Sequence, residues 1–236
     1  MNHPTPKNSL SFAVRGRYAL FTDPLTRVGG EKCSYHIPTY EALKGIVESI
    51  YWKPTFTWVI DKVRIMKPIR TEAKNMKPIN ISGGNSLATY TYLSDVCYQV
   101  MAHFEWNLHR EDLKHDRQDG KHWDVAKRML KKGGRRDIFL GTRECQGYVE
   151  PCEYGSDQSL HDTAGELGYG LMFHGFDYPD TIGKPELHSR FWHAIVRNGE
   201  IEFPRPDDPR IQRRFVREMT ANPPESVGLN EKGLFE

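Results

Sequence analysis

Apolar and polar residues alternate in three segments of the first half of the chain, which is typical of half-buried β-strands. The first segment begins at Leu10 and ends before Asp23-Pro24, the second runs from about Phe56 to Met66, and the third runs from Val96 to Asn107. In the second segment the alternation changes parity near Asp61, which predicts a β-bulge there. The Gly- and Pro-containing stretch 67–94 predicts a long, partly basic functional loop between the second and third strands.

Helical spacing replaces alternation in two places. The first predicted helix follows Thr39, a favourable N-cap, and ends before Pro54, because the residue before a proline disfavours helix. The second spans about His122 to Lys132, with Gly133-Gly134 as its stop signal. One apolar stripe of the first helix consists of Leu43, Ile46, Val47, Ile50 and Tyr51.

The order of these elements predicts the fold class. Residues 137–140 are interpreted as a fourth strand, so that residues 9–150 run strand, helix, strand, strand, helix, strand. This is the ferredoxin-like order, which is also the scaffold of the RNA-recognition motif. The sequence therefore predicts an α+β protein with a ferredoxin-like, RRM-like N-terminal domain.

The pattern changes after residue 150. Residues 153–190 are rich in Gly, Asp and Pro, and alternation returns only at 192–203, where Asn198-Gly199 favours a type I′ hairpin turn. We interpret residues 151–206 as a small β-rich C-terminal domain. Residues 207–236 are rich in Pro, Arg and Glu and are expected to form a flexible tail.

The net charge of +2 conceals an uneven distribution. Residues 1–150 carry 24 Lys and Arg against 16 Asp and Glu, whereas residues 151–236 carry 9 against 15. A basic half of this kind suggests a nucleic-acid face, although ordinary charge scatter gives similar splits. The cations that we expect to contact phosphates cluster on the second helix and the loop after it, and they are Lys127, Arg128, Lys131, Lys132, Arg135, Arg136 and Arg143.

Few residues suggest chemistry on their own. Lys121-His122 at a helix start is compatible with phosphoryl chemistry, but a lone histidine there is more often a surface or capping residue. A metal-dependent nuclease would use Asp112, Asp116 and Asp119, which a solvated charged loop explains better. The four cysteines have no zinc-site spacing, and no cofactor motif is present, so we expect no cofactor. No signal peptide or membrane-length apolar run is evident, which predicts a cytoplasmic protein.

Four motifs carry a resemblance to a known family: Tyr18–Pro24, Pro38–Gly45, Glu48–Pro54 and Gly134–Tyr148. They resemble the CRISPR-associated Cas five family of the Dvulg subtype (type I-C), in the repeat-associated (RAMP) superfamily. The resemblance covers roughly residues 9–206. It implies an endoribonuclease that cuts CRISPR precursor RNA at the base of each repeat hairpin.

The resemblance also implies a mechanism and partners. The ribose 2′-OH attacks the adjacent phosphate without a metal ion, and the family's catalytic trio corresponds to Tyr51, Lys121 and His122. Either Tyr51 or His122 is the base, His122 is the acid, and Lys121 stabilises charge. The enzyme then holds the guide-RNA handle beside the backbone and large subunits of the interference complex. The alternatives are a non-cleaving guide-RNA-binding subunit and a metal-dependent DNA nuclease.

Overall fold

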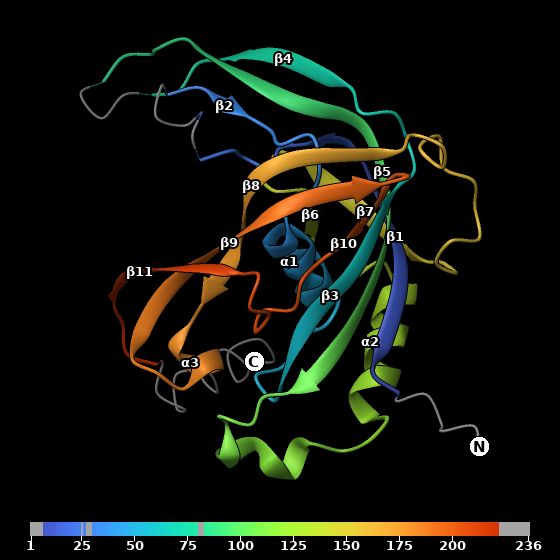
Figure 1. The fold of residues 1–236 in the computed structure, drawn as a ribbon, viewed down its shortest axis with the longest axis vertical. Helices are drawn as coiled ribbons and strands as arrows, with labels where there is room; N and C mark the ends of the chain where they lie inside the picture. Colours follow the sequence, from blue (N-terminus) through green and yellow to red (C-terminus); the bar gives the residue numbers. More distant parts are fainter. Residues whose placement is uncertain (1–6, 25, 27–29, 80–82, 222–236) are drawn as a thin grey trace.

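The computed structural model describes residues 7–24, 26, 30–79 and 83–221, whose strands belong to one extended sheet (Figure 1). The strands are β1 (Ser9–Ala19), β2 (Lys32–Cys33), β3 (Phe56–Ile65), β4 (Thr71–Met76), β5 (Ala88–Trp106), β6 (Ile138–Phe139), β7 (Gln146–Pro151), β8 (Glu166–Asp177), β9 (Glu186–Arg197), β10 (Glu200–Glu202) and β11 (Gln212–Glu218). The helices are α1 (Tyr40–Ile50), the 3-10 helix η2 (Glu111–Asp116), α2 (Lys121–Lys131) and the short α3 (Pro179–Ile182). The chain is therefore an α+β protein with few helices.

The sheet is antiparallel at every pairing of its main path. Its order is β11-β9-β10-β3-β5-β1-β7-β6, while β2 and β4 pair with β5 and β8 pairs with β9. Among the strands of the described residues, only the short β2 pairs in parallel. Helix α1 contacts both β3 and β8, and α2 contacts β1 and β7. As Figure 1 shows, α1 lies inside the curve of the sheet.

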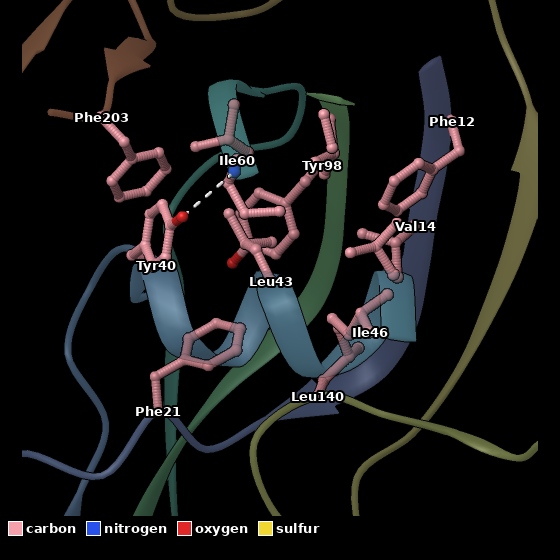
Figure 2. Packing of buried hydrophobic residues seen from close by; sticks show 14 of the residues in the cluster. Phe12, Val14, Phe21, Tyr40, Leu43, Ile46, Ile60, Tyr98, Leu140 and Phe203 are labelled. Atoms are coloured by element: carbon pink, nitrogen blue, oxygen red, sulfur yellow. Dashed lines mark hydrogen bonds between the residues drawn. The ribbon is translucent and has the colours of Figure 1, made fainter. Parts of the chain in front are cut away.

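Helix α1 forms where the apolar stripe predicts it. The side chain of Thr39 accepts a hydrogen bond from the Ala42 amide at 3.3 Å, which confirms Thr39 as the N-cap. Leu43 and Ile46 face the sheet side chains Val14 and Tyr98 in a fully buried core (Figure 2). Burial of this stripe fixes the rotation of α1 and therefore the direction of the residue that follows it.

Two local predictions are confirmed. The pairing of β3 with β5 shifts register between Ile60 and Lys62, which is the predicted bulge near Asp61. The hairpin between β9 and β10 turns at Asn198 and Gly199, whose φ angles of 49° and 74° are the positive values that a type I′ turn requires. Strand β10 also pairs with β3, so the C-terminal strands extend the same sheet.

The prediction of a long loop at residues 67–94 is wrong. Residues 71–76 form β4, which pairs along its whole length with the first part of β5, so that the third strand begins at Ala88 instead of Val96. Most of β4 is exposed and its side chains are largely polar, so no apolar alternation marks it. Strand β4 is held in place by main-chain hydrogen bonds to the long strand β5.

Two further assignments also differ. The strand beside β1 is β7, and the predicted strand at 137–140 is only the two-residue β6, which pairs with β7. In the predicted tail, residues 212–218 form β11 and pair with β9, whereas residues 222–236 lie outside the described part of the chain. Every β11 side chain is exposed, which explains why no hydrophobic pattern predicts it.

Candidate active site

Tyr51 and His122 meet at the junction of the two main helices. Tyr51 is the first residue after α1, where its backbone becomes extended, and His122 is the second residue of α2. The Tyr51 hydroxyl lies 2.9 Å from Nδ1 of His122. The Trp58 indole donates a 2.8 Å hydrogen bond to the Tyr51 carbonyl, which fixes the chain at this point. The side-chain contact joins residues 71 positions apart in the sequence.

The hydrogen bonds of His122 define its tautomer. Nε2 lies 2.9 Å from the backbone carbonyl oxygen of Asp116, which can only accept a hydrogen bond. Nε2 therefore carries the proton, and in the neutral ring Nδ1 is the acceptor. It follows that the Tyr51 hydroxyl donates to His122, an arrangement that draws the phenolic proton toward the ring.

The pair is shielded from water. Tyr51 is 5% exposed and His122 is 1% exposed. The rings of Phe56 and Trp106 lie 5.2 Å and 5.7 Å from the His122 ring, centroid to centroid. In such surroundings a change of charge on His122 is felt strongly by neighbouring groups, because little water screens it.

Lys121 joins this pair through an acidic residue. Its ammonium group bonds to one carboxylate oxygen of Asp116, while 46% of the Lys121 side chain stays exposed. The other Asp116 oxygen accepts a 2.8 Å hydrogen bond from Thr55 and lies 3.3 Å from Nε2 of His122. Burial raises the pKa of the Asp116 carboxyl, but the bonds from Lys121 and Thr55 outweigh it and leave the pKa below its ordinary value.

All three residues of the expected trio are thus within one connected network. Sequence reasoning assigned Asp116 only to the alternative metal site, together with Asp112 and Asp119. In the structure Asp112 forms a two-point ion pair with Arg110. Over the described residues there is no group of three or more His, Cys, Asp or Glu side chains placed to hold a metal ion.

The predicted cation cluster is displayed on the surface. One member, Lys127, lies over the Trp123 ring at 4.0 Å, and another, Arg136, is near enough to Glu48 to lower the pKa of that carboxyl against the effect of its burial. The exposed members are Lys127, Arg128, Lys131, Lys132, Arg135, Arg136 and Arg143. Such charges are available to a polyanion.

The loop after α2 is fixed against the end of α1. Gly133 and Gly134 adopt positive φ angles of 86° and 110°, which turn the chain back toward α1. The amides of Arg135 and Arg136 then donate to the Ser49 carbonyl at 3.1 Å and 3.0 Å. These bonds satisfy a carbonyl left open at the helix end and hold the arginine pair near Tyr51, two residues further on.

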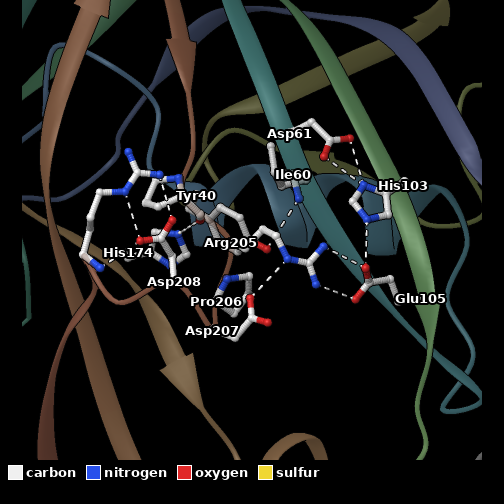
Figure 3. Close-up of polar contacts among 12 residues, drawn as sticks. Tyr40, Ile60, Asp61, His103, Glu105, His174, Arg205, Pro206, Asp207 and Asp208 are labelled. Carbon is white, nitrogen blue, oxygen red and sulfur yellow. Dashed lines mark hydrogen bonds and ion pairs between the residues drawn. The ribbon is translucent and has the colours of Figure 1, made fainter.

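A second polar cluster lies on the face of β5 that is turned away from the candidate site (Figure 3). His103 contacts Asp61 at 2.8 Å, and Arg205 makes two bonds to Glu105, at 2.8 Å and 3.0 Å. The hydrogen bond with Asp61 is the main cause that raises the pKa of His103 above its ordinary value. This cluster ties the segment after β10 to the sheet and is separate from the candidate site.

Two solved structures share this fold. One, described as a CRISPR-associated protein, is 35% identical, with a TM-score of 0.73 over 89% of this chain and all of its own. A functionally uncharacterized protein from Streptococcus mutans is 39% identical, with a TM-score of 0.70 over the same shares.

The family follows from the sequence comparison. The Cas5d family model, described as a CRISPR-associated protein (Cas5), matches residues 9–204, and the chain therefore belongs to this family. A protein of Thermus thermophilus named CRISPR pre-crRNA endoribonuclease Cas5d is 29% identical over 83% of this chain and 91% of its own length. A protein of Mannheimia succiniciproducens with the same name is 28% identical over 84% and 95%. No helix in the described part of the chain has the length and apolarity needed to cross a membrane.

Proposed function

We propose that this chain is a CRISPR precursor-RNA endoribonuclease that cuts at the base of the repeat hairpin without a metal ion. The observation that carries the proposal is the buried contact between the Tyr51 hydroxyl and Nδ1 of His122, with Lys121 beside it. The two curated relatives described above are named for cleavage of pre-crRNA. A tyrosine, a histidine and a lysine can together supply the acid–base and charge-stabilising functions that RNA transesterification requires.

In the proposed reaction the ribose 2′-OH attacks the adjacent phosphorus and the bond to the 5′-oxygen breaks. Tyr51 takes the 2′-OH proton as its own phenolic proton passes to Nδ1 of His122. Lys121, whose ammonium has donors left beyond its bond to Asp116, stabilises the negative charge of the phosphorane. The imidazolium then returns its Nδ1 proton to Tyr51, whose hydroxyl passes a proton to the leaving 5′-oxygen. The products are a 2′,3′-cyclic phosphate and a 5′-hydroxyl.

The exposed cations are the proposed track for the RNA backbone. The arginine pair, Arg135 and Arg136, is the centre of this track because its loop is fixed against the end of α1. Planar guanidinium groups bind phosphates at two points, which orients the strand as well as attracting it. After cleavage the same surface would keep the 5′ handle of the guide, with the chain retained as a subunit of the type I-C interference complex in the cytoplasm.

We further propose that residues 9–150 form a ferredoxin-like domain and that the β-rich segment 151–206 is an appendage to it. The order β3-β5-β1-β7, with α1 after β1 and α2 after β5, supports this assignment.

The test is cleavage of a repeat RNA by the purified protein in EDTA. The proposal expects cutting at one position at the hairpin base, and loss of at least about 10²-fold in rate for His122→Ala. Intact RNA in EDTA would reject the enzyme assignment, and cutting that survives His122→Ala would reject the site. Cleavage of DNA that requires a divalent ion would instead favour the metal-dependent nuclease.

One observation favours the second candidate, a guide-RNA-binding subunit that does not cut. Both ring nitrogens of His122 are bonded to protein atoms, and the ring is almost wholly buried. A purely structural Tyr–His pair would have the same appearance. This candidate predicts tight binding of repeat RNA by the wild-type protein and by His122→Ala alike, with no cleavage by either.

A further inference from the structure

One residue, Asp116, contacts three other members of the candidate site network. Its carboxylate accepts bonds from Lys121 and Thr55, and its backbone carbonyl lies 2.9 Å from Nε2 of His122. It closes the short helix η2, in which no side chain is buried. Residues on so exposed a helix normally have solvated side chains, but only 20% of the Asp116 side chain is exposed.

The position of Asp116 is determined by the loop that carries it. The next residue, Arg117, donates from one guanidinium nitrogen to the carbonyls of Asn107 and Arg110, each at 2.8 Å. The Asn107 amide in turn donates to the Thr55 carbonyl at 2.9 Å. Thr55 is 1% exposed and also bonds the Asp116 carboxylate. The loop is therefore attached to this buried residue twice, before η2 through Asn107 and at the end of η2 through Asp116.

These contacts have two chemical consequences. When His122 gains a proton, the nearby Asp116 carboxylate, 3.3 Å from Nε2, compensates the new charge where water cannot. Lys121 has a long side chain with much rotamer freedom, and its bond to Asp116 restricts where the ammonium can lie. Because Lys121 and Thr55 occupy the two carboxylate oxygens, Asp116 acts on the reaction through its neighbours and not on the RNA.

We propose that Asp116 is a positioning residue for cleavage, fixing the His122 tautomer through its carbonyl and holding Lys121 through its carboxylate. This inference rests on the endoribonuclease function proposed above.

The experiment compares Asp116→Asn with Asp119→Asn, a matched control that makes the same substitution three residues further on, at an exposed position. Single-turnover cleavage of repeat RNA at saturating protein gives the chemical rate constant, and filter binding gives the RNA Kd. We expect Asp116→Asn to lower the rate constant about 10- to 100-fold with Kd within about twofold, as for displaced catalytic groups. Asp119→Asn should match the wild type.

Thr55 supplies a second pair of variants that keeps the proposal testable if Asp116→Asn folds poorly. Thr55→Val has the same shape but lacks the hydroxyl, and should slow cleavage about threefold to tenfold. Thr55→Ser restores the hydroxyl and should recover most of the rate. A purely packing role would be satisfied by valine at least as well as by serine.

Two results would overturn the inference. Cleavage by Asp116→Asn at or above the wild-type rate would mean that the carboxylate restrains Lys121 instead of placing it. The second readout needs no RNA: ring ¹⁵N chemical shifts should show His122 protonated at Nε2 and bare at Nδ1, both in the wild type and in Asp116→Ala, which keeps the backbone carbonyl. A ring protonated at Nδ1 and bare at Nε2 rejects positioning through the Asp116 carbonyl, whereas failure of the wild type to cut RNA rejects only the proposed function.

Discussion

Replacement of Tyr51 by phenylalanine removes the hydroxyl group that acts as the base in the proposed mechanism. Phenylalanine keeps the ring that packs 5.8 Å from Phe56, so the change leaves the core filled. It also leaves Nδ1 of His122 without its partner in a buried site. An unsatisfied buried polar atom costs about 1–3 kcal/mol, and in a chain of this size Tm should fall by roughly 2–12 °C.

The effect of Tyr51→Phe on cleavage should be far larger than its effect on stability. Loss of a general base lowers the rate about 10²- to 10⁴-fold. The assay is single-turnover cleavage of a repeat RNA in EDTA, with RNA binding and thermal unfolding measured on the same preparation. Tyr148→Phe, which removes a hydroxyl from an exposed tyrosine, is the control and should change neither quantity. Wild-type cleavage by a folded Tyr51→Phe variant would refute the assignment of Tyr51 as base.

Three further predictions test the RNA surface and the fold. Replacing Arg135 and Arg136 by alanine should weaken RNA binding and reduce the slope of log K against log salt by about 1–2, measured by titration at several ionic strengths. The hydrogen bond with Asp61 raises the pKa of His103, so the charged ring stabilises the protein fully below about pH 6.5, and this contribution is lost as the pH rises through the folded-state pKa. Chemical denaturation at several pH values should show that His103→Gln lacks this pH dependence. Gly141 has a φ of 95°, and a Cβ there would lie 2.0 Å from a backbone oxygen, so Gly141→Ala should destabilise the protein by more than about 2 kcal/mol in the same assay.

The elements with buried apolar faces could be predicted from the sequence. The stripe that ends at Tyr51, the parity change near Asp61 and the Asn198-Gly199 turn each correspond to an element of the structure. Strands β4 and β11 could not be predicted, because both are exposed and are held by main-chain pairing with β5 and β9. Hydrophobic periodicity contains no information about such strands.

The candidate site, too, could be predicted only in part from the sequence. The position of Tyr51 relative to Lys121 and His122 was implied only by the family resemblance, since no local pattern relates residues 71 positions apart. Asp116 was missed as a member of the network because its neighbours in sequence resemble a solvated charged loop. Its role depends on the direction of its own backbone carbonyl and on its hydrogen bond with Thr55. Both are features of the tertiary structure, which residue spacing does not encode.

In the proposed mechanism the Tyr51–His122 pair, with Lys121, promotes attack by a 2′-hydroxyl group. The most direct measurement is cleavage of a repeat RNA in EDTA, using a second substrate in which the single nucleotide before the cut carries a 2′-deoxy sugar. The expected result is a 2′,3′-cyclic phosphate on the product of the all-ribose RNA and no cutting of the deoxy-substituted RNA. Cleavage of both substrates, or a product with a 3′-hydroxyl, would contradict it.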